Sequence, residues 1–128
     1  MFTVRVELLS LDESRGVELE VVVDTGATFT MVSKSVAEQL GFVGRIRRRL
    51  RLGDNDLVER DIGPLLMRYE GETMVVPIAV GAEGEIPVLG ATAMEILGLW
   101  VDPTGHALVR RDAFELGMSP AVASEALY

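Results

Sequence analysis

The chain has 128 residues, 48% of them hydrophobic and 25% charged, which is typical of one globular domain with its own core. It contains no cysteine, which excludes disulfides and cysteine-ligated metal sites and permits a reducing compartment. The formal net charge of −8 argues against a general nucleic-acid binder.

Neither the start of the chain nor its longest apolar segment has the pattern of a membrane or export signal. Arg5 and Glu7 interrupt the first apolar stretch, so it does not match a signal peptide. Residues 86–101 are broken by Pro87 and Gly90 and are shorter than the roughly 20 apolar residues that a membrane helix needs. We therefore expect a soluble, cytoplasmic protein with no membrane and no nucleic-acid partner.

Short strands dominate the expected secondary structure. Apolar and polar side chains alternate in most segments, which is the pattern of a half-buried strand. Turn-forming residues, such as the cluster at 53–56, separate these segments. The expected strands span residues 2–8, 17–23, 46–52, 57–62, 64–69, 73–80, 86–89, 99–101 and 107–110.

Two short helices are expected among the strands. Residues 33–40 predict the first, with Ser35 and Glu38 as a capping box and Gly41 just after its end. The tail from 112 to 128 has only weak helical character. The second predicted helix repeats the pattern of a capping pair and a glycine with Thr92, Glu95 and Gly98.

The strand at 17–23 runs into an Asp-Thr-Gly triplet at 24–26. Asp24 stands at the mouth of a turn that can bend tightly because Gly26 tolerates positive φ. Taken alone, an aspartate before Thr-Gly is more often a turn residue than a catalytic one. However, the Gly-Ala-Thr of 26–28 returns at 90–92, again between a strand and a short helix that ends in Leu-Gly. This repeat suggests two halves related by a pseudo-two-fold axis.

With these two motifs, residues 1–110 resemble the retropepsin-like aspartic proteases, the single-lobed relatives of pepsin. The segment 24–28 resembles the family's Asp-Thr-Gly motif, and 88–90 its apolar-apolar-Gly signature. The resemblance implies an all-β, closed barrel-like fold with one or two short helices and one lobe per chain. It assigns residues 1–110 to a protease domain and leaves 111–128 as a C-terminal extension without an assigned role.

The resemblance also implies a function. The chain has one such motif and is too short for two lobes, so a catalytic pair needs Asp24 from each subunit of a homodimer. The implied activity is an aspartic endopeptidase that hydrolyses peptides or unfolded proteins by activating water between two carboxyls, without cofactor or metal. The alternative is a catalytically weak or silent dimeric peptide-binding module of the same fold.

The implied site has three parts. Asp24 is the catalytic residue, and Thr25 and Gly26 support it. The hairpin at about 46–61 resembles the family's flap, a lid over the substrate. Thr28 and Ala91 stand where the family often has an acid and an arginine, and the flap tip is unusually polar. The implied substrate-binding residues are Ala27, Thr28, Leu52, Gly53, Asp54 and Val88.

Several other residues invite less specific interpretations. Five of the 12 basic residues lie between Arg45 and Arg51, and we favour a solvated flap arm over a guide for acidic peptides, with nucleic-acid binding the weakest option. His106 is expected to be exposed, and Trp100 to pack in a core or interface strand. Glu83 and Glu85 are expected to be solvated. The methionines expected to fill the core are Met31, Met67, Met74 and Met94.

Overall fold

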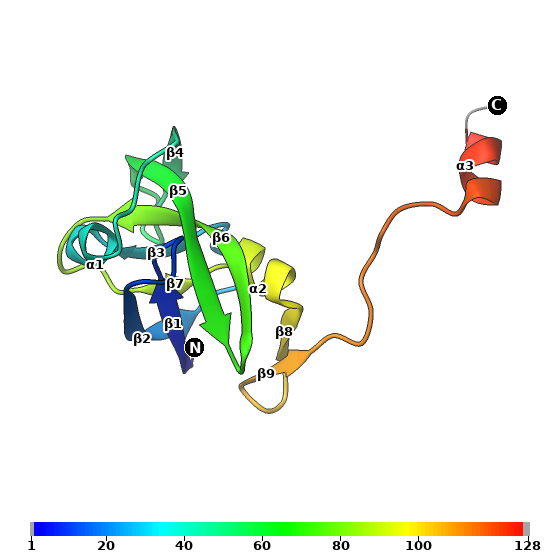
Figure 1. Cartoon of the computed structure of the whole chain (residues 1–128), viewed down its shortest axis with the longest axis horizontal. Coiled ribbons are helices and arrows are strands. Elements are labelled where there is room, and N and C mark those ends of the chain that lie inside the picture. Colours follow the sequence, from blue (N-terminus) through cyan, green and yellow to red (C-terminus); the bar gives the residue numbers. More distant parts are fainter. Residues whose placement is uncertain (1, 127–128) are drawn as a thin grey trace.

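The computed structural model describes residues 2–126 of the chain. Nine strands and three short helices occur in this range. Figure 1 shows how they are arranged. The first half contains β1 (Thr3–Leu9), β2 (Gly16–Val23), β3 (Thr30–Ser33), α1 (Lys34–Gln39) and β4 (Ile46–Arg51). The second half contains β5 (Leu57–Tyr69), β6 (Glu72–Gly81), β7 (Val88–Leu89), α2 (Ala91–Leu97), β8 (Leu99–Asp102), β9 (Ala107–Arg110) and α3 (Pro120–Ala126).

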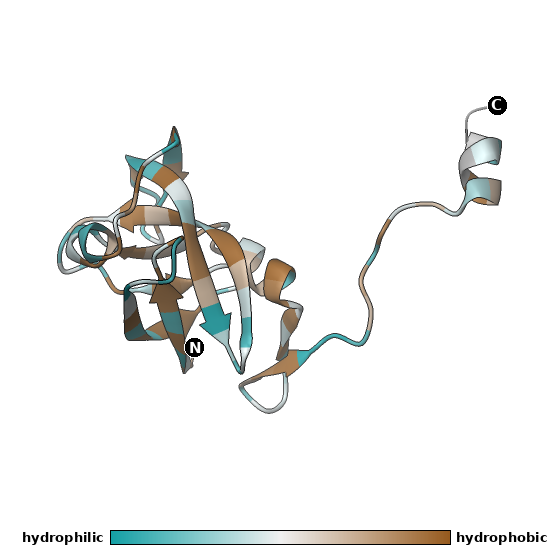
Figure 2. Cartoon of the chain, in the orientation of Figure 1, coloured by the Kyte–Doolittle hydropathy of each residue, from teal (hydrophilic) through white to brown (hydrophobic). Residues whose placement is uncertain are grey.

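Seven of the strands form one sheet in the order β1-β2-β7-β3-β6-β5-β4. A further pairing of β1 with β5 brings the sheet round on itself, so that it forms a partially closed ring. The predicted all-β architecture with short helices is therefore confirmed. The hydropathy of the strands alternates along their length in Figure 2, as expected for strands with one buried face.

The core fills the inside of this ring. It is built from the inward residues of the strands and from the apolar faces of α1 and α2. Each fully buried Leu, Ile or Val contributes about 1.5–3 kcal/mol relative to an exposed position. The largest fully buried apolar side chains are Leu8, Val21, Val32, Leu40, Leu65, Met67, Val76, Ile78 and Leu89.

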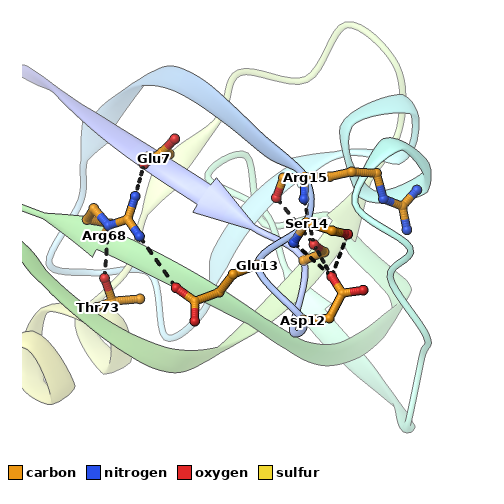
Figure 3. Close-up of polar contacts among 8 residues, drawn as sticks. Glu7, Asp12, Glu13, Ser14, Arg15, Arg68 and Thr73 are labelled. Atoms are coloured by element: carbon orange, nitrogen blue, oxygen red, sulfur yellow. Dashed lines mark hydrogen bonds and ion pairs between the residues drawn. The ribbon is translucent and has the colours of Figure 1, made fainter.

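An ion-pair cluster stabilises the junction where β1 meets β5. Glu7 and Arg68 are directly opposite each other in the register, and Arg68 Nη1 lies 2.6 Å from Glu7 Oε1. Arg68 also donates to the Thr73 hydroxyl (3.1 Å) and approaches Glu13 in the β1–β2 turn (3.5 Å). Figure 3 shows Arg68 between these three partners. A cross-strand pair of opposite charge thus supports the contact that closes the ring.

The region of the first helix differs from the prediction in two ways. Residues 30–33 form β3, which the sequence patterns did not reveal because the strand has only four residues. Helix α1 begins at Lys34, and Ser33 is its N-cap, since its hydroxyl accepts a hydrogen bond from Val36 N (3.3 Å). The predicted Ser35–Glu38 capping box is wrong, because Ser35 N instead donates to Glu83 (2.9 Å). Gly41 has φ +67° and ends the helix as predicted.

Two predicted strand boundaries are also wrong. Residues 57–62 and 64–69 form the single strand β5, because Pro64 pairs with Pro77 and the ladder continues past them. The strand predicted at 86–89 is limited to its last two residues. Ile86 is not buried but 66% exposed.

The second helix has Gly90 rather than Thr92 as its N-cap, while Gly98 adopts the predicted left-handed conformation at its end. Of the methionines expected in the core, Met67 and Met94 are buried, whereas Met74 is 47% exposed. Met74 lies near the exposed end of the β5–β6 hairpin, where its strand extends beyond the core.

The chain continues past α2 into the hairpin of β8 and β9, in which Trp100 lies opposite Val109. Trp100 is 57% exposed and is not part of the core of this chain. Its indole contacts the guanidinium of Arg111, which also lies over the ring of Phe114. Residues 112–119 then lead away from the strands to α3 (Figure 1). The end of the domain at 110 remains a prediction. Among the described residues, no helix is long and apolar enough to cross a membrane.

Candidate active site

The Asp24 loop begins where β2 ends, against strand β7. Asp24 N donates to Leu89 O (3.0 Å), which continues the parallel pairing of Val23 with Leu89. The loop then turns back, with Gly26 N donating to Asp24 Oδ1 (2.9 Å) and Ala27 N to Asp24 O (3.2 Å). The carboxyl group is thereby fixed at the end of a strand and is only partly buried.

The Asp24 carboxyl keeps most of its hydrogen-bonding capacity. Among the described residues, Gly26 N is its only hydrogen-bond donor. Thr25 and Gly26 are both exposed, and the Thr25 hydroxyl makes no hydrogen bond within residues 2–126. A carboxylate can accept about four hydrogen bonds. The arrangement therefore leaves Asp24 free to accept further hydrogen bonds or to exchange a proton.

The repeated Gly-Ala-Thr segments lie against each other. Ala91 N donates to Ala27 O (2.7 Å), and Thr92 N donates to Thr28 O (3.1 Å). The first turn of α2 thus binds the carbonyl groups of the Asp24 loop. The two motifs that the sequence analysis singled out form one structural unit.

A buried threonine and a glycine make this unit possible, and the sequence analysis assigned no role to the threonine. Thr30 is fully buried, and its hydroxyl accepts a hydrogen bond from Gly90 N (3.1 Å). A Cβ atom on Gly90 would lie 2.5 Å from both the carbonyl carbon and oxygen of Phe29. Only glycine allows this close approach of two backbones. The one sequence signal was the polar Thr30 inside a short β-forming run.

The predicted flap is a long hairpin of β4 and β5, paired from Ile46 with Ile62 to Arg51 with Leu57. At its tip, Leu52 N donates to Asp56 O (2.8 Å) and Asn55 N to Leu52 O (2.9 Å). Asn55 takes the positive φ of the turn (+71°). The turn expected at 53–56 is therefore confirmed.

A family model and a number of solved structures resemble this chain. A family model described as aspartyl protease matches residues 11–64. The protease of EIAV, solved with the inhibitor HBY-793, is 22% identical, with 75% of this chain and 86% of that chain covered and a TM-score of 0.52. The retroviral protease-like domain of Ddi1 from Leishmania major is 15% identical, with coverages of 88% and 91% and a TM-score of 0.52. No curated protein sequence matches.

This chain has the fold of the retropepsin-like aspartic proteases. The resemblance inferred from the two motifs is thereby confirmed. The matched segment 11–64 contains the whole Asp24 loop and the hairpin tip.

The predicted site residues of this retropepsin-like chain fall into two groups. One group surrounds the end of β2, and the other forms the hairpin tip. No hydrogen bond within the described residues joins them. Their roles stay predictions. The first group contains Asp24, Thr25, Gly26, Ala27, Thr28 and the partly buried Val88, and the second contains Leu52, Gly53 and Asp54.

A groove in this structure lies away from both groups. It has a volume of about 470 Å³ and lies between α1 and the base of the flap, and neither Asp24 nor the hairpin tip lines it. Arg47 lies in this groove and pairs with Asp61 (2.9 Å) and Glu59 (3.5 Å). The hydrogen bond to Asp61 is the main reason that the pKa of Arg47 is raised. We assign this groove no catalytic role, since its charged groups already neutralise one another.

The expectation that Glu85 is solvated is wrong. Its Oε1 accepts hydrogen bonds from Arg60 Nη2 (2.6 Å) and Ala82 N (3.2 Å). The side chains of Arg60 and Glu85 are only 20% and 25% exposed. The pair therefore connects the flap strand β5 to the loop that leads into β7. In the described residues, no three His, Cys, Asp or Glu side chains are grouped so that they could hold a metal ion.

Proposed function

We propose that this protein is a homodimeric aspartic endopeptidase in which Asp24 and its counterpart in a second copy form the catalytic pair. The observation that carries the proposal is the Asp24 loop itself. The Asp24 backbone N–H is held at a strand end by Leu89 O, and the carboxyl accepts a hydrogen bond from Gly26 N and stays partly accessible. The Asp-Thr-Gly triplet occurs once in the chain. Because general acid–base hydrolysis by carboxyls needs two of them, a second copy must supply the other.

The proposed chemistry uses one proton shared by the pair. Two carboxyls about 3 Å apart cannot both ionise cheaply, so one stays protonated. The ionised carboxyl takes a proton from a water molecule, whose oxygen attacks the peptide carbonyl carbon. The protonated carboxyl donates to the carbonyl oxygen. Cleavage of the C–N bond follows when one carboxyl protonates the nitrogen and the other takes a proton back from a hydroxyl of the tetrahedral intermediate. The product carboxyl group then forms, and the pair again holds one shared proton.

The surroundings of Asp24 suit an extended peptide. Thr25 and Gly26 are exposed beside the carboxyl, so a peptide backbone can approach closely there. Ile86 and Val88 offer apolar surface just before the second motif, and the hairpin of β4 and β5 has the length of a lid. Strand-like hydrogen bonds to such a peptide would give affinity without strict sequence specificity.

The test combines mass, cleavage and one substitution. The purified protein should behave as a dimer in sedimentation and should cut an unfolded protein of known sequence at acidic to neutral pH. Asp24→Asn should abolish cleavage and leave the dimer intact. Asp12→Asn is the matched control, because Asp12 also accepts a backbone hydrogen bond two residues on. Cleavage that survives Asp24→Asn would refute the proposal.

The second candidate is a dimeric module that binds peptides without hydrolysing them. The polar tip of the flap favours it, because Asp54 accepts a hydrogen bond from Asp56 N (3.0 Å) and presents a carboxylate where a lid would meet its substrate. Saturable binding of extended peptides, with no product after long incubation, would identify this module instead.

A further inference from the structure

The two faces of the flap hairpin differ in how their charges are balanced. Side chains alternate along β4 and β5, so the odd-numbered residues share one face. On that face, Arg47 pairs with Glu59 and Asp61 beside α1. Arg49 and Arg51 share this face and make no ion pair within the described residues.

The even-numbered residues of β4 and β5 share the opposite face of the hairpin. Arg48 is directly opposite Arg60, and Leu50 is opposite Val58. Arg60 reaches across to Glu85, in the loop that precedes β7. Strand β7 in turn pairs with the end of β2, which leads to Asp24. This face of the flap is therefore the one that turns toward the side of the fold where Asp24 lies.

Arg48 has no acidic partner on this face. Its only hydrogen bond within residues 2–126 goes from Nη1 to Arg47 O, at 3.3 Å. Like charges directly opposite each other on neighbouring strands are unfavourable, and Glu85 compensates only Arg60. The Arg48 guanidinium thus remains uncompensated on the even-numbered face of the flap, in a chain whose net charge is −8.

We propose that Arg48 binds an acidic side chain of the peptide substrate. The proposal rests on the proposed function, since it names the class of substrate that the same site would take. A peptide that pairs with the hairpin as an added strand points every second side chain toward the same face. A Glu or Asp of the substrate, a few residues from the scissile bond, would then meet the free guanidinium while Arg60 stays held by Glu85.

An acidic peptide fits this face better than a nucleic acid does. Glu85 lies beside Arg60 on this face, and Glu59 and Asp61 lie beside Arg47 on the other. Phosphate groups that follow the hairpin would therefore meet carboxylates as well as arginines. A single acidic side chain needs only one free guanidinium. Nucleic-acid binding is therefore an outcome of the test rather than the proposal.

The test uses pairs of peptides that share one cleavage site, mapped first in an unfolded protein. The two members of a pair differ only by Glu or Gln at one position, two to four residues from the scissile bond. Above pH 5.5, where Glu is ionised, we expect kcat/KM to be about fivefold higher for the Glu peptide at one position, as for a partly exposed charge-assisted hydrogen bond. Arg48→Gln should reduce this ratio to about one.

Arg49→Gln is the matched control. Arg49 lies next to Arg48 on the same strand, is exposed and makes no ion pair within the described residues, but it belongs to the opposite face. Its substitution changes the net charge equally and should leave the ratio near five. Equal Glu and Gln rates at every position, or equal losses in both variants, would overturn the proposal.

Three further outcomes separate the role of Arg48 from the proposed function and from nucleic-acid binding. Cleavage that persists in Asp24→Asn would refute the proposed function itself. Cleavage that depends on Asp24 but shows no Glu preference would refute only the role of Arg48. An oligonucleotide whose affinity falls in Arg48→Gln, while peptide rates stay unchanged, would assign the arginine to nucleic acid instead. Thermal unfolding of both variants checks that these exposed substitutions leave the fold intact.

Discussion

The Asp24 turn and the Asp12 turn share one local geometry and differ in chemistry. In both, a carboxylate Oδ1 accepts a backbone hydrogen bond from the residue two positions on, at 2.9 Å from Gly26 N and 3.0 Å from Ser14 N. Asp12 also accepts from the hydroxyls of Ser14 and Ser10, both at 2.7 Å. Figure 3 shows the contacts between Asp12 and Ser14.

The extra donors determine the acidity of the second turn. The hydrogen bonds from Ser14, and then from Ser10, lower the pKa of Asp12 from 3.8 to about 2. The turn at Asp102 behaves alike, because the backbone N–H and hydroxyl of Thr104 lower the pKa of its carboxyl. At Asp24, the residue in the equivalent position is Gly26, which has no hydroxyl to donate.

The comparison shows what separates a structural aspartate from a candidate catalytic one. A capping aspartate gains from every added donor, because its only task is to hold a turn in the ionised state. A general acid–base must change its protonation state and needs free lone pairs. Gly26 supplies the backbone N–H that holds the turn but has no hydroxyl. The Asp24 carboxyl therefore keeps lone pairs free for catalysis.

The largest effect should come from replacing the two aspartates in turn. Asp24→Asn should lower kcat/KM for an unfolded protein substrate by about 10³-fold or more, because an amide can neither take nor share a proton. Asp12→Asn should change the rate by less than about twofold. A fixed-time cleavage assay with both variants measures the contrast. Similar losses in the two variants would abolish the distinction between the turns.

The next effect concerns the support behind the Asp24 turn. Gly90→Ala should destabilise the protein by about 3 kcal/mol, because the new Cβ would lie 2.5 Å from the Phe29 backbone. Gly26→Ala should cost much less, since its Cβ meets only Asp24 Oδ1, at 3.3 Å. Urea unfolding of the two variants provides the measurement. If Gly90→Ala unfolds at the same urea concentration as Gly26→Ala, the close contact is not essential.

The sequence predicted much of this arrangement, and its omissions have a physical cause. Alternation predicted the long strands, and the two motifs at 24–28 and 88–92 led to the retropepsin-like fold. These signals are local or repeated, so they survive in a single sequence. The role of Thr30 was missed, because it depends on Gly90 in a segment far along the chain.

The same reasoning explains the errors at Glu85 and Ile86. Their environments are set by the packing of a loop between β6 and β7, in which Arg60 of β5 finds Glu85 while Ile86 is left exposed. Neither periodicity nor turn composition encodes such contacts between distant segments. Likewise, Pro64 lies opposite Pro77 inside one continuous β5–β6 ladder. That β5 continues through Pro64 can be predicted only when the register of both strands is known.

A smaller effect should follow when the missing hydroxyl is restored. Gly26→Ser gives the Asp24 turn the donor that Ser14 supplies to Asp12, and the hydroxyl would stabilise the ionised carboxylate. We expect kcat/KM to fall by about tenfold and its pH profile to move to lower pH. Gly26→Ala separates this effect from added bulk, since it should lower the rate without moving the profile. An identical pH profile in the two variants would mean that the donors do not distinguish the turns.

The smallest effect should appear in acid stability, at the Asp12 turn. Because the pKa of Asp12 is about 2 in the folded protein and 3.8 as a free group, its ionised form stabilises the fold above about pH 4. That stabilisation is lost progressively as the pH falls from about 4 to 2. Thermal unfolding should therefore show a higher Tm for the natural protein than for Asp12→Asn at pH 5, and the difference should shrink toward pH 2. Ser14→Ala should reduce the same difference in part, because it removes one hydroxyl donor and keeps the carboxylate. A Tm difference that stays constant from pH 5 to pH 2 would show that the hydroxyls do not set the acidity of this turn, and the contrast with Asp24 would then lose its electrostatic basis.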